Sequence, residues 1–127
     1  MDPFYWFAVF VAANALMVIA LALNVSSLRI RLKVANGDGG RVELKRAIRA
    51  HANGVEHVTM FGLIVLALSL LAAQDTWLAA LVGAFTLARI LHAAGMLASQ
   101  FNLRRVGASV TYLAELAGVL LLLRYLV

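Results

Sequence analysis

The chain has 127 residues, of which 64% are hydrophobic and only 13% charged, and its formal net charge is +5. Soluble domains are typically about 45–50% apolar and about 25% charged, so the composition indicates an integral membrane protein with one domain, residues 1–127. The chain has no cysteine, which excludes disulfides and a thiolate nucleophile of its own, and we expect no metal site.

Four apolar segments predict four membrane-spanning helices in an all-α chain, at about residues 4–32, 42–73, 77–101 and 106–126. The first segment lacks a basic start and is too long for the apolar region of a signal peptide, so we expect it to be retained. The turn-rich stretch ANGDGG (residues 35–40) follows it. The second helix would be about 48 Å long at about 1.5 Å per residue, whereas the hydrocarbon core is about 30 Å thick. Its first third should therefore project from the membrane or lie at the interface.

The two remaining links are short. AQDT joins the second span to the third, and NLRR (residues 102–105) joins the third to the fourth. Short links between successive helices predict an up-down-up-down four-helix bundle. Most lysines and arginines flank the first and third links, whereas the opposite side has only Arg124. The positive-inside rule then places the basic loops in the cytoplasm and both termini outside, in the inner or plasma membrane if the source is bacterial. Since topology accounts for the basic residues, we expect no nucleic-acid partner.

Several small residues on the third and fourth spans, Gly95 and Gly107 among them, permit close approach between helices. We therefore expect a homo-oligomer, although composition does not give the number of subunits. Asn14 on the first span should hydrogen-bond to a neighbouring helix.

The stretch RAIRAHANGVEH (residues 46–57) places polar side chains at the start of an apolar span. Arg46, Arg49, Asn53 and Glu56 are three, four and three residues apart, which puts them on one face of a helix. An arginine offers a planar fork for a carboxylate, an asparagine both donates and accepts, and Glu56 could hold an ammonium group. This face suits a small zwitterion with several carboxylates and an amine. The alternative is a network that only closes a helix interface.

A second polar face lies on the third span. Arg89 and Glu115 both lie about 18 Å from the outer ends of their helices, and we expect them to form an ion pair because either charge alone would be costly in the membrane. His92 lies deeper and would contact either a ligand or a backbone carbonyl. Arg104 and Arg105 either set the topology or stabilise an anion, and a guanidinium beside a thiol favours the reactive thiolate.

The motif RAHANGVE (residues 49–56) resembles the R-A-H-x-N-x-x-E signature of the MAPEG family, the membrane-associated proteins in eicosanoid and glutathione metabolism. RILHAAG on the third span and SVTY on the fourth are similar to segments of its microsomal glutathione transferase and prostaglandin E synthase branch. The resemblance covers almost the whole chain. It implies a homotrimer in membrane lipid, with active sites between subunits near the cytoplasmic side. There the thiolate of bound glutathione, a co-substrate, attacks or reduces a lipophilic small molecule from the bilayer.

The resemblance also assigns site residues by position. Those implied to bind glutathione are Arg29, Arg49, Asn53, Glu56, His57 and His92. Arg104, with Arg105 as the rival, matches the catalytic arginine that polarises the thiol. This chain departs from the family where Met96 and His57 replace tyrosines and where Thr59 replaces a proline.

The resemblance leaves three classes of function open. A glutathione transferase or peroxidase is favoured, because Arg49, Asn53 and Glu56 are all present. The alternative is a non-catalytic lipid-binding scaffold of the same fold. A small transporter is disfavoured, since we find no inverted repeat or broken helix.

Overall fold

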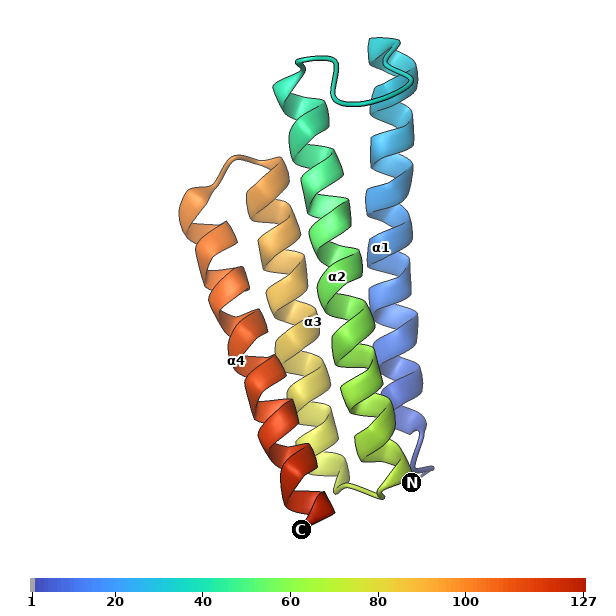
Figure 1. Ribbon diagram of the computed structural model, residues 1–127, viewed down its shortest axis with the longest axis vertical. Coiled ribbons are helices and arrows are strands. Elements are labelled where there is room, and N and C mark those ends of the chain that lie inside the picture. Colours follow the sequence, from blue (N-terminus) through green and yellow to red (C-terminus); the bar gives the residue numbers. More distant parts are fainter. Residues whose placement is uncertain (1) are drawn as a thin grey trace.

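The computed structural model describes residues 2–127 as four helices joined by short links (Figure 1). The helices are α1 (Tyr5–Leu32), α2 (Val42–Leu70), α3 (Asp75–Leu97) and α4 (Phe101–Leu126). Each is long and apolar enough to cross a membrane, since about 20 residues suffice. The predicted all-α, multi-pass membrane chain with four apolar helices is thus confirmed.

The third link differs from its prediction. α4 begins at Phe101 rather than at residue 106, so the placement of residues 102–105 in a link was wrong. The chain turns instead at Ser99, whose φ of 58° ends α3, and at Gln100, which is extended. Nothing in NLRR prevents a helix, because it contains neither glycine nor proline. Arg104 and Arg105 therefore have fixed positions on the first turns of α4.

The helices run side by side in the order α1, α2, α3, α4, and the α1–α2 link extends beyond the α3–α4 link (Figure 1). Within residues 2–127, α1 and α4 do not contact each other, whereas α2 and α3 each contact the other three helices. The approach of α3 to α4 is close: a Cβ added at Gly107 would lie 2.5 Å from the backbone nitrogen of His92, and one at Gly95 would overlap the backbone of Arg104. The predicted use of these glycines for close helix packing is confirmed.

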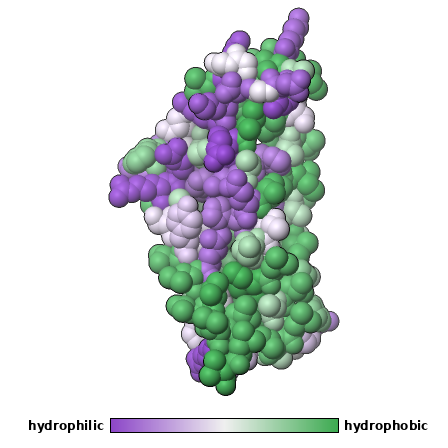
Figure 2. Space-filling view, in the orientation of Figure 1, coloured by the Kyte–Doolittle hydropathy of each residue, from purple (hydrophilic) through white to green (hydrophobic). Residues whose placement is uncertain are grey.

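The apolar core lies in the half of the protein near the chain termini. The rings of Phe61 and Phe85 stack with centroids 4.0 Å apart, and the ring of Phe10 tilts against both. Beside this core, Nδ2 of Asn14 donates to Oγ1 of Thr86 at 2.9 Å, which confirms that Asn14 joins α1 to another helix. Figure 2 shows the outer surface of this half as mostly hydrophobic, and the half with the α1–α2 link as largely hydrophilic.

Candidate functional site

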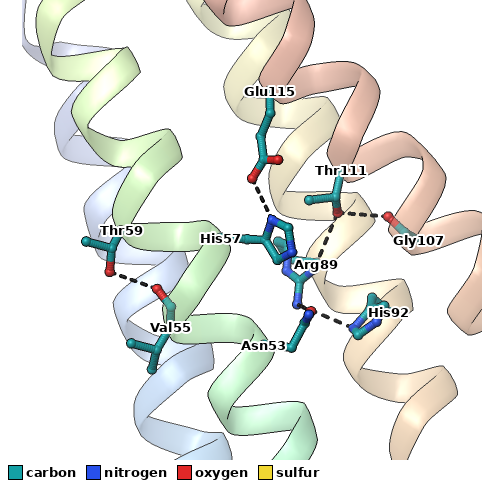
Figure 3. Close-up of polar contacts among 9 residues, drawn as sticks. All are labelled: Asn53, Val55, His57, Thr59, Arg89, His92, Gly107, Thr111 and Glu115. Atoms are coloured by element: carbon teal, nitrogen blue, oxygen red, sulfur yellow. Dashed lines mark hydrogen bonds and ion pairs between the residues drawn. The ribbon is translucent and has the colours of Figure 1, made fainter.

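A buried polar layer joins α2, α3 and α4 at the middle of the molecule (Figure 3). Its centre is Arg89, whose side chain is 1% exposed. Nη2 of Arg89 donates to Oδ1 of Asn53 at 2.6 Å and to Nδ1 of His92 at 3.3 Å, and Nη1 donates to Oγ1 of Thr111 at 3.5 Å. A buried charge needs such partners because its desolvation is expensive. The layer therefore fixes the rotation of three helices relative to one another.

The predicted ion pair between Arg89 and Glu115 is wrong. Oε1 of Glu115 lies 2.6 Å from Nδ1 of His57, and within residues 2–127 no carboxylate lies at ion-pair distance from Arg89. Tyr112 packs edge-on against the His57 ring, with centroids 5.5 Å apart. Equal depth in the membrane gives two residues the same height, but the rotation of each helix decides which side chains meet. Glu115 points toward His57, while Arg89 extends toward Asn53 (Figure 3).

The predicted face of α2 divides into two environments. Asn53 is half-buried, and since Arg89 occupies its Oδ1, its Nδ2 is left to donate elsewhere. Arg49 and Glu56 are exposed on the protomer. Glu56 is also the midpoint of α2, about 21 Å from either end at about 1.5 Å per residue. A carboxylate at this depth is costly against lipid, so this face requires a cover of protein, ligand or water.

A pocket rich in positive charge lies where the first third of α2 meets the α3–α4 link. We call it the basic pocket, and its volume is about 390 Å³. Its lining residues are Val42, Lys45, Arg46, Arg49, Gly95, Met96, Ser99, Phe101 and Arg104. The lining includes four cations and no carboxylate, so its electrostatic potential favours anions.

Arg104 is held in place within the basic pocket. Nη1 of Arg104 lies 3.8 Å from Sδ of Met96, and its guanidinium lies 5.5 Å from the centre of the Phe101 ring. The second contact has the geometry of a cation–π interaction. Met96, which departs from the family pattern, thus contacts the guanidinium that the resemblance assigns to the thiol.

The other predicted site residues lie outside the basic pocket. Arg29 is at the end of α1, where Nη1 donates to the carbonyl oxygens of Val34 at 3.3 Å and Gly37 at 2.7 Å and so orders the α1–α2 link. Arg105 is exposed and does not line the basic pocket. His92 is buried against Arg89.

Of the residues predicted from sequence for the polar face or the glutathione site, the protomer therefore brings Arg46, Arg49 and Arg104 together in one cavity. Lys45 was missed, although its place one helical turn before Arg49 was a usable signal. Phe101 was missed because it was expected at the end of a span. In the part of the chain that the structure describes, no group of His, Cys, Asp or Glu residues could hold a metal ion.

Comparison with known proteins gives a family match over most of the chain. The model of the MAPEG family matches residues 7–124. The chain is 36% identical over 120 residues to the inner membrane protein YecN of Escherichia coli strain K12. The aligned residues make up 94% of this chain and 91% of YecN. YecN of Escherichia coli O6:H1 strain CFT073 matches with the same values. No solved structure matches.

Proposed function

Because the chain belongs to the MAPEG family, we propose that it is a membrane-bound, glutathione-dependent transferase or peroxidase. The observation that carries the proposal is the basic pocket, whose four cations include two residues of the predicted site, Arg49 and Arg104. Glutathione has two carboxylates, one ammonium group and a thiol. A pocket without carboxylates of its own suits a ligand with this excess of negative charge.

The roles of the side chains follow from their chemistry. The planar guanidinium of Arg49 forms paired hydrogen bonds with one glutathione carboxylate. Lys45 and Arg46, which line the same cavity, bind the second carboxylate. Asn53 presents Nδ2 to a glutathione carbonyl, because Arg89 already occupies its Oδ1. Glu56 binds the ammonium group.

Arg104 stabilises the thiolate of bound glutathione. Free thiols have a pKa of about 8.5, and an adjacent guanidinium lowers it. In the transferase reaction the thiolate sulfur bonds to an electrophilic carbon of the lipophilic substrate, which expels a leaving group or is then protonated. In the peroxidase reaction two glutathione thiols reduce one hydroperoxide, giving glutathione disulfide, an alcohol and water. Arg105, on the adjacent position of α4, is the alternative to Arg104 for this role.

The proposal includes a homotrimer with the site between subunits. The exposed Glu56 supports it, because a neighbouring subunit would cover a carboxylate that lipid cannot solvate. A neighbour would also complete the site with Arg29 and His57, whereas His92, buried against Arg89, would support the site from within its own protomer. The outer faces of α1 and α4 do not meet within the protomer, so each is free to form a cleft for the lipophilic substrate with an adjacent subunit.

We further propose the microsomal glutathione transferase and prostaglandin E synthase branch, on the strength of RILHAAG and SVTY. The basic α1–α2 link faces the cytoplasm and the termini lie outside. The membrane is the bacterial inner membrane, as the similarity to an inner membrane protein of Escherichia coli supports.

Calorimetric titration of the detergent-solubilised protein with glutathione tests the site. We expect Arg49→Ala to weaken binding by about 10- to 100-fold, since a charge-assisted hydrogen bond contributes about 1.5–3 kcal/mol. Arg41→Ala is the matched control, because Arg41 is an exposed cation at the same end of α2 that does not line the basic pocket. Equal losses in both variants, or no binding by the unmodified protein, would refute the site. Binding without turnover of any electrophile or hydroperoxide would instead identify a non-catalytic member of the family.

A further inference from the structure

A cavity larger than the basic pocket lies on the opposite half of the protein, between α3 and α4. Its volume is about 580 Å³, and no residue of α1 or α2 lines it. We call it the outer groove. Its walls include Trp77, Ala80 and Ala84 of α3 and Ala114, Ala117 and Arg124 of α4. None of these residues belongs to the proposed glutathione site.

The outer groove owes its volume to the alanines. Ala80 and Ala84 are one helical turn apart on α3, and Ala114 and Ala117 are almost one turn apart on α4. Where two helices pack closely, side chains of this size leave a channel along the seam that larger ones would fill. Apart from Arg124, the lining is apolar or aromatic. The groove thus offers a hydrocarbon chain a fitted surface.

The end of the outer groove nearest the chain termini is polar and positively charged. Arg124 lies there on the last turn of α4, and Trp77, which is 50% exposed, lies beside it. A second cavity of about 220 Å³ shares Trp77, Leu121 and Arg124 with the outer groove and adds Gln74 and Tyr125. The Tyr125 hydroxyl accepts a hydrogen bond from the backbone N–H of Gln74 at 3.2 Å and retains its own hydrogen to donate.

No acidic side chain pairs with the cation at this end, among residues 2–127. Arg124 has no ion pair among the residues that the structure describes, and the carboxylate of Asp75, at the start of α3, lines neither cavity. The guanidinium and the tyrosine hydroxyl are hydrogen-bond donors that suit a phosphate group, and a tryptophan beside them is typical of the membrane interface.

The length of the outer groove matches one lipid. From Val110 to Arg124 the helix rises about 21 Å at about 1.5 Å per residue. One leaflet, headgroup included, is about 20–22 Å thick, half of the bilayer's roughly 40–45 Å. We propose that the outer groove binds one anionic phospholipid of the leaflet at the chain termini, with its phosphate on Arg124 and an acyl chain along the alanines.

Fluorescence quenching by brominated lipids tests this site. The chain has two tryptophans, so Trp6→Phe leaves Trp77 as the only reporter. In bilayers we expect brominated phosphatidylglycerol to associate with the groove roughly fivefold more strongly than brominated phosphatidylcholine, the effect of one cation on one anionic lipid. Arg124→Gln should reduce this ratio to about one. Arg41→Gln, which removes an exposed charge at the other end, should leave it unchanged.

A second pair of variants tests whether an acyl chain lies along the alanines of the outer groove. Ala84→Phe should reduce quenching of Trp77 by both lipids, whereas Ala12→Phe, at an exposed position on α1, should not. If Ala84→Phe fails to fold, Arg124→Gln alone tests the lipid site, because Arg124 is exposed and its substitution should not disturb the fold. Equal association of the two lipids with the unmodified groove would overturn the proposal. A change of oligomeric size in Ala84→Phe, with no lipid preference, would show that a second copy covers the groove. Neither readout involves glutathione, so either result leaves the proposed function untouched.

Discussion

The buried layer around Arg89 makes a quantitative prediction about stability. Asn53→Leu removes the shortest of the three hydrogen bonds of Arg89, at 2.6 Å, and leaves contacts of 3.3 and 3.5 Å. Hydrogen bonds to charged groups contribute about 1.5–3 kcal/mol, and removal of one partner leaves the buried charge poorly compensated. We expect Asn53→Leu to lower the free energy of unfolding by about 2 kcal/mol.

The loss of unfolding free energy caused by Asn53→Leu should nearly disappear when the guanidinium of Arg89 is absent. In an Arg89→Met background, Asn53→Leu should cost less than about 0.5 kcal/mol, because no buried guanidinium is left without its acceptor. The coupling energy of the pair is then about 1.5 kcal/mol, near the upper end of values measured by double-mutant cycles in a membrane protein, about 1.7 kcal/mol. Arg89→Met with Glu115→Gln is the matched cycle, and there we expect coupling below about 0.5 kcal/mol.

Reversible unfolding in mixed micelles with increasing sodium dodecyl sulfate, followed by tryptophan fluorescence, measures all four free energies of each cycle. Additive costs for Arg89 and Asn53 would refute the reasoning. So would a stronger coupling of Arg89 to Glu115, since it would restore the ion pair that the structure replaces with the contact between Glu115 and His57.

Three further predictions concern other contacts. Arg104→Ala should raise the pKa of the bound glutathione thiol toward the free value of about 8.5, whereas Arg105→Ala should leave it unchanged. Thiolate absorbance titrated against pH measures the pKa in both variants. Equal midpoints in the two variants would show that Arg104 does not stabilise the thiolate. Gly107→Ala should lower the free energy of unfolding by at least about 1 kcal/mol through overpacking against backbone, which detergent unfolding would detect; an unchanged midpoint would contradict the close contact. Asn14→Leu should cost about 0.6 kcal/mol by the loss of one interhelical hydrogen bond to Thr86; in a Thr86→Val background the same substitution should cost almost nothing.

The elements of the fold follow directly from the distribution of apolar residues. Long apolar stretches separated by short polar links indicate four spanning helices, because only intrahelical hydrogen bonds satisfy the backbone in lipid. The start of α4 was harder to predict. Polar residues before a span read equally well as a link or as a first helical turn, and the deciding feature, the left-handed backbone at Ser99, has no distinctive residue type.

The arrangement of the candidate site residues was predictable along one helix but not between helices. Helical spacing places Arg49, Asn53 and Glu56 on one face of α2 without any tertiary information. The partner of Arg89 depends on the rotation of three helices, which depth alone does not give. The meeting of Arg104 with Arg49 in one cavity likewise depends on the packing of α4 against α3 at Gly95.

That glycine contact helps to set the shape of the basic pocket. Because the Arg104 backbone lies against Gly95, any side chain at position 95 would push α4 away from α3 and move Arg104 away from the cations that α2 contributes to the basic pocket. The hydrogen bond between Asn53 and Arg89 joins α2 to the α3–α4 hairpin. The spacing of the four cations therefore depends on a backbone contact and on a partly buried hydrogen bond, neither of which involves a charged group of the basic pocket itself.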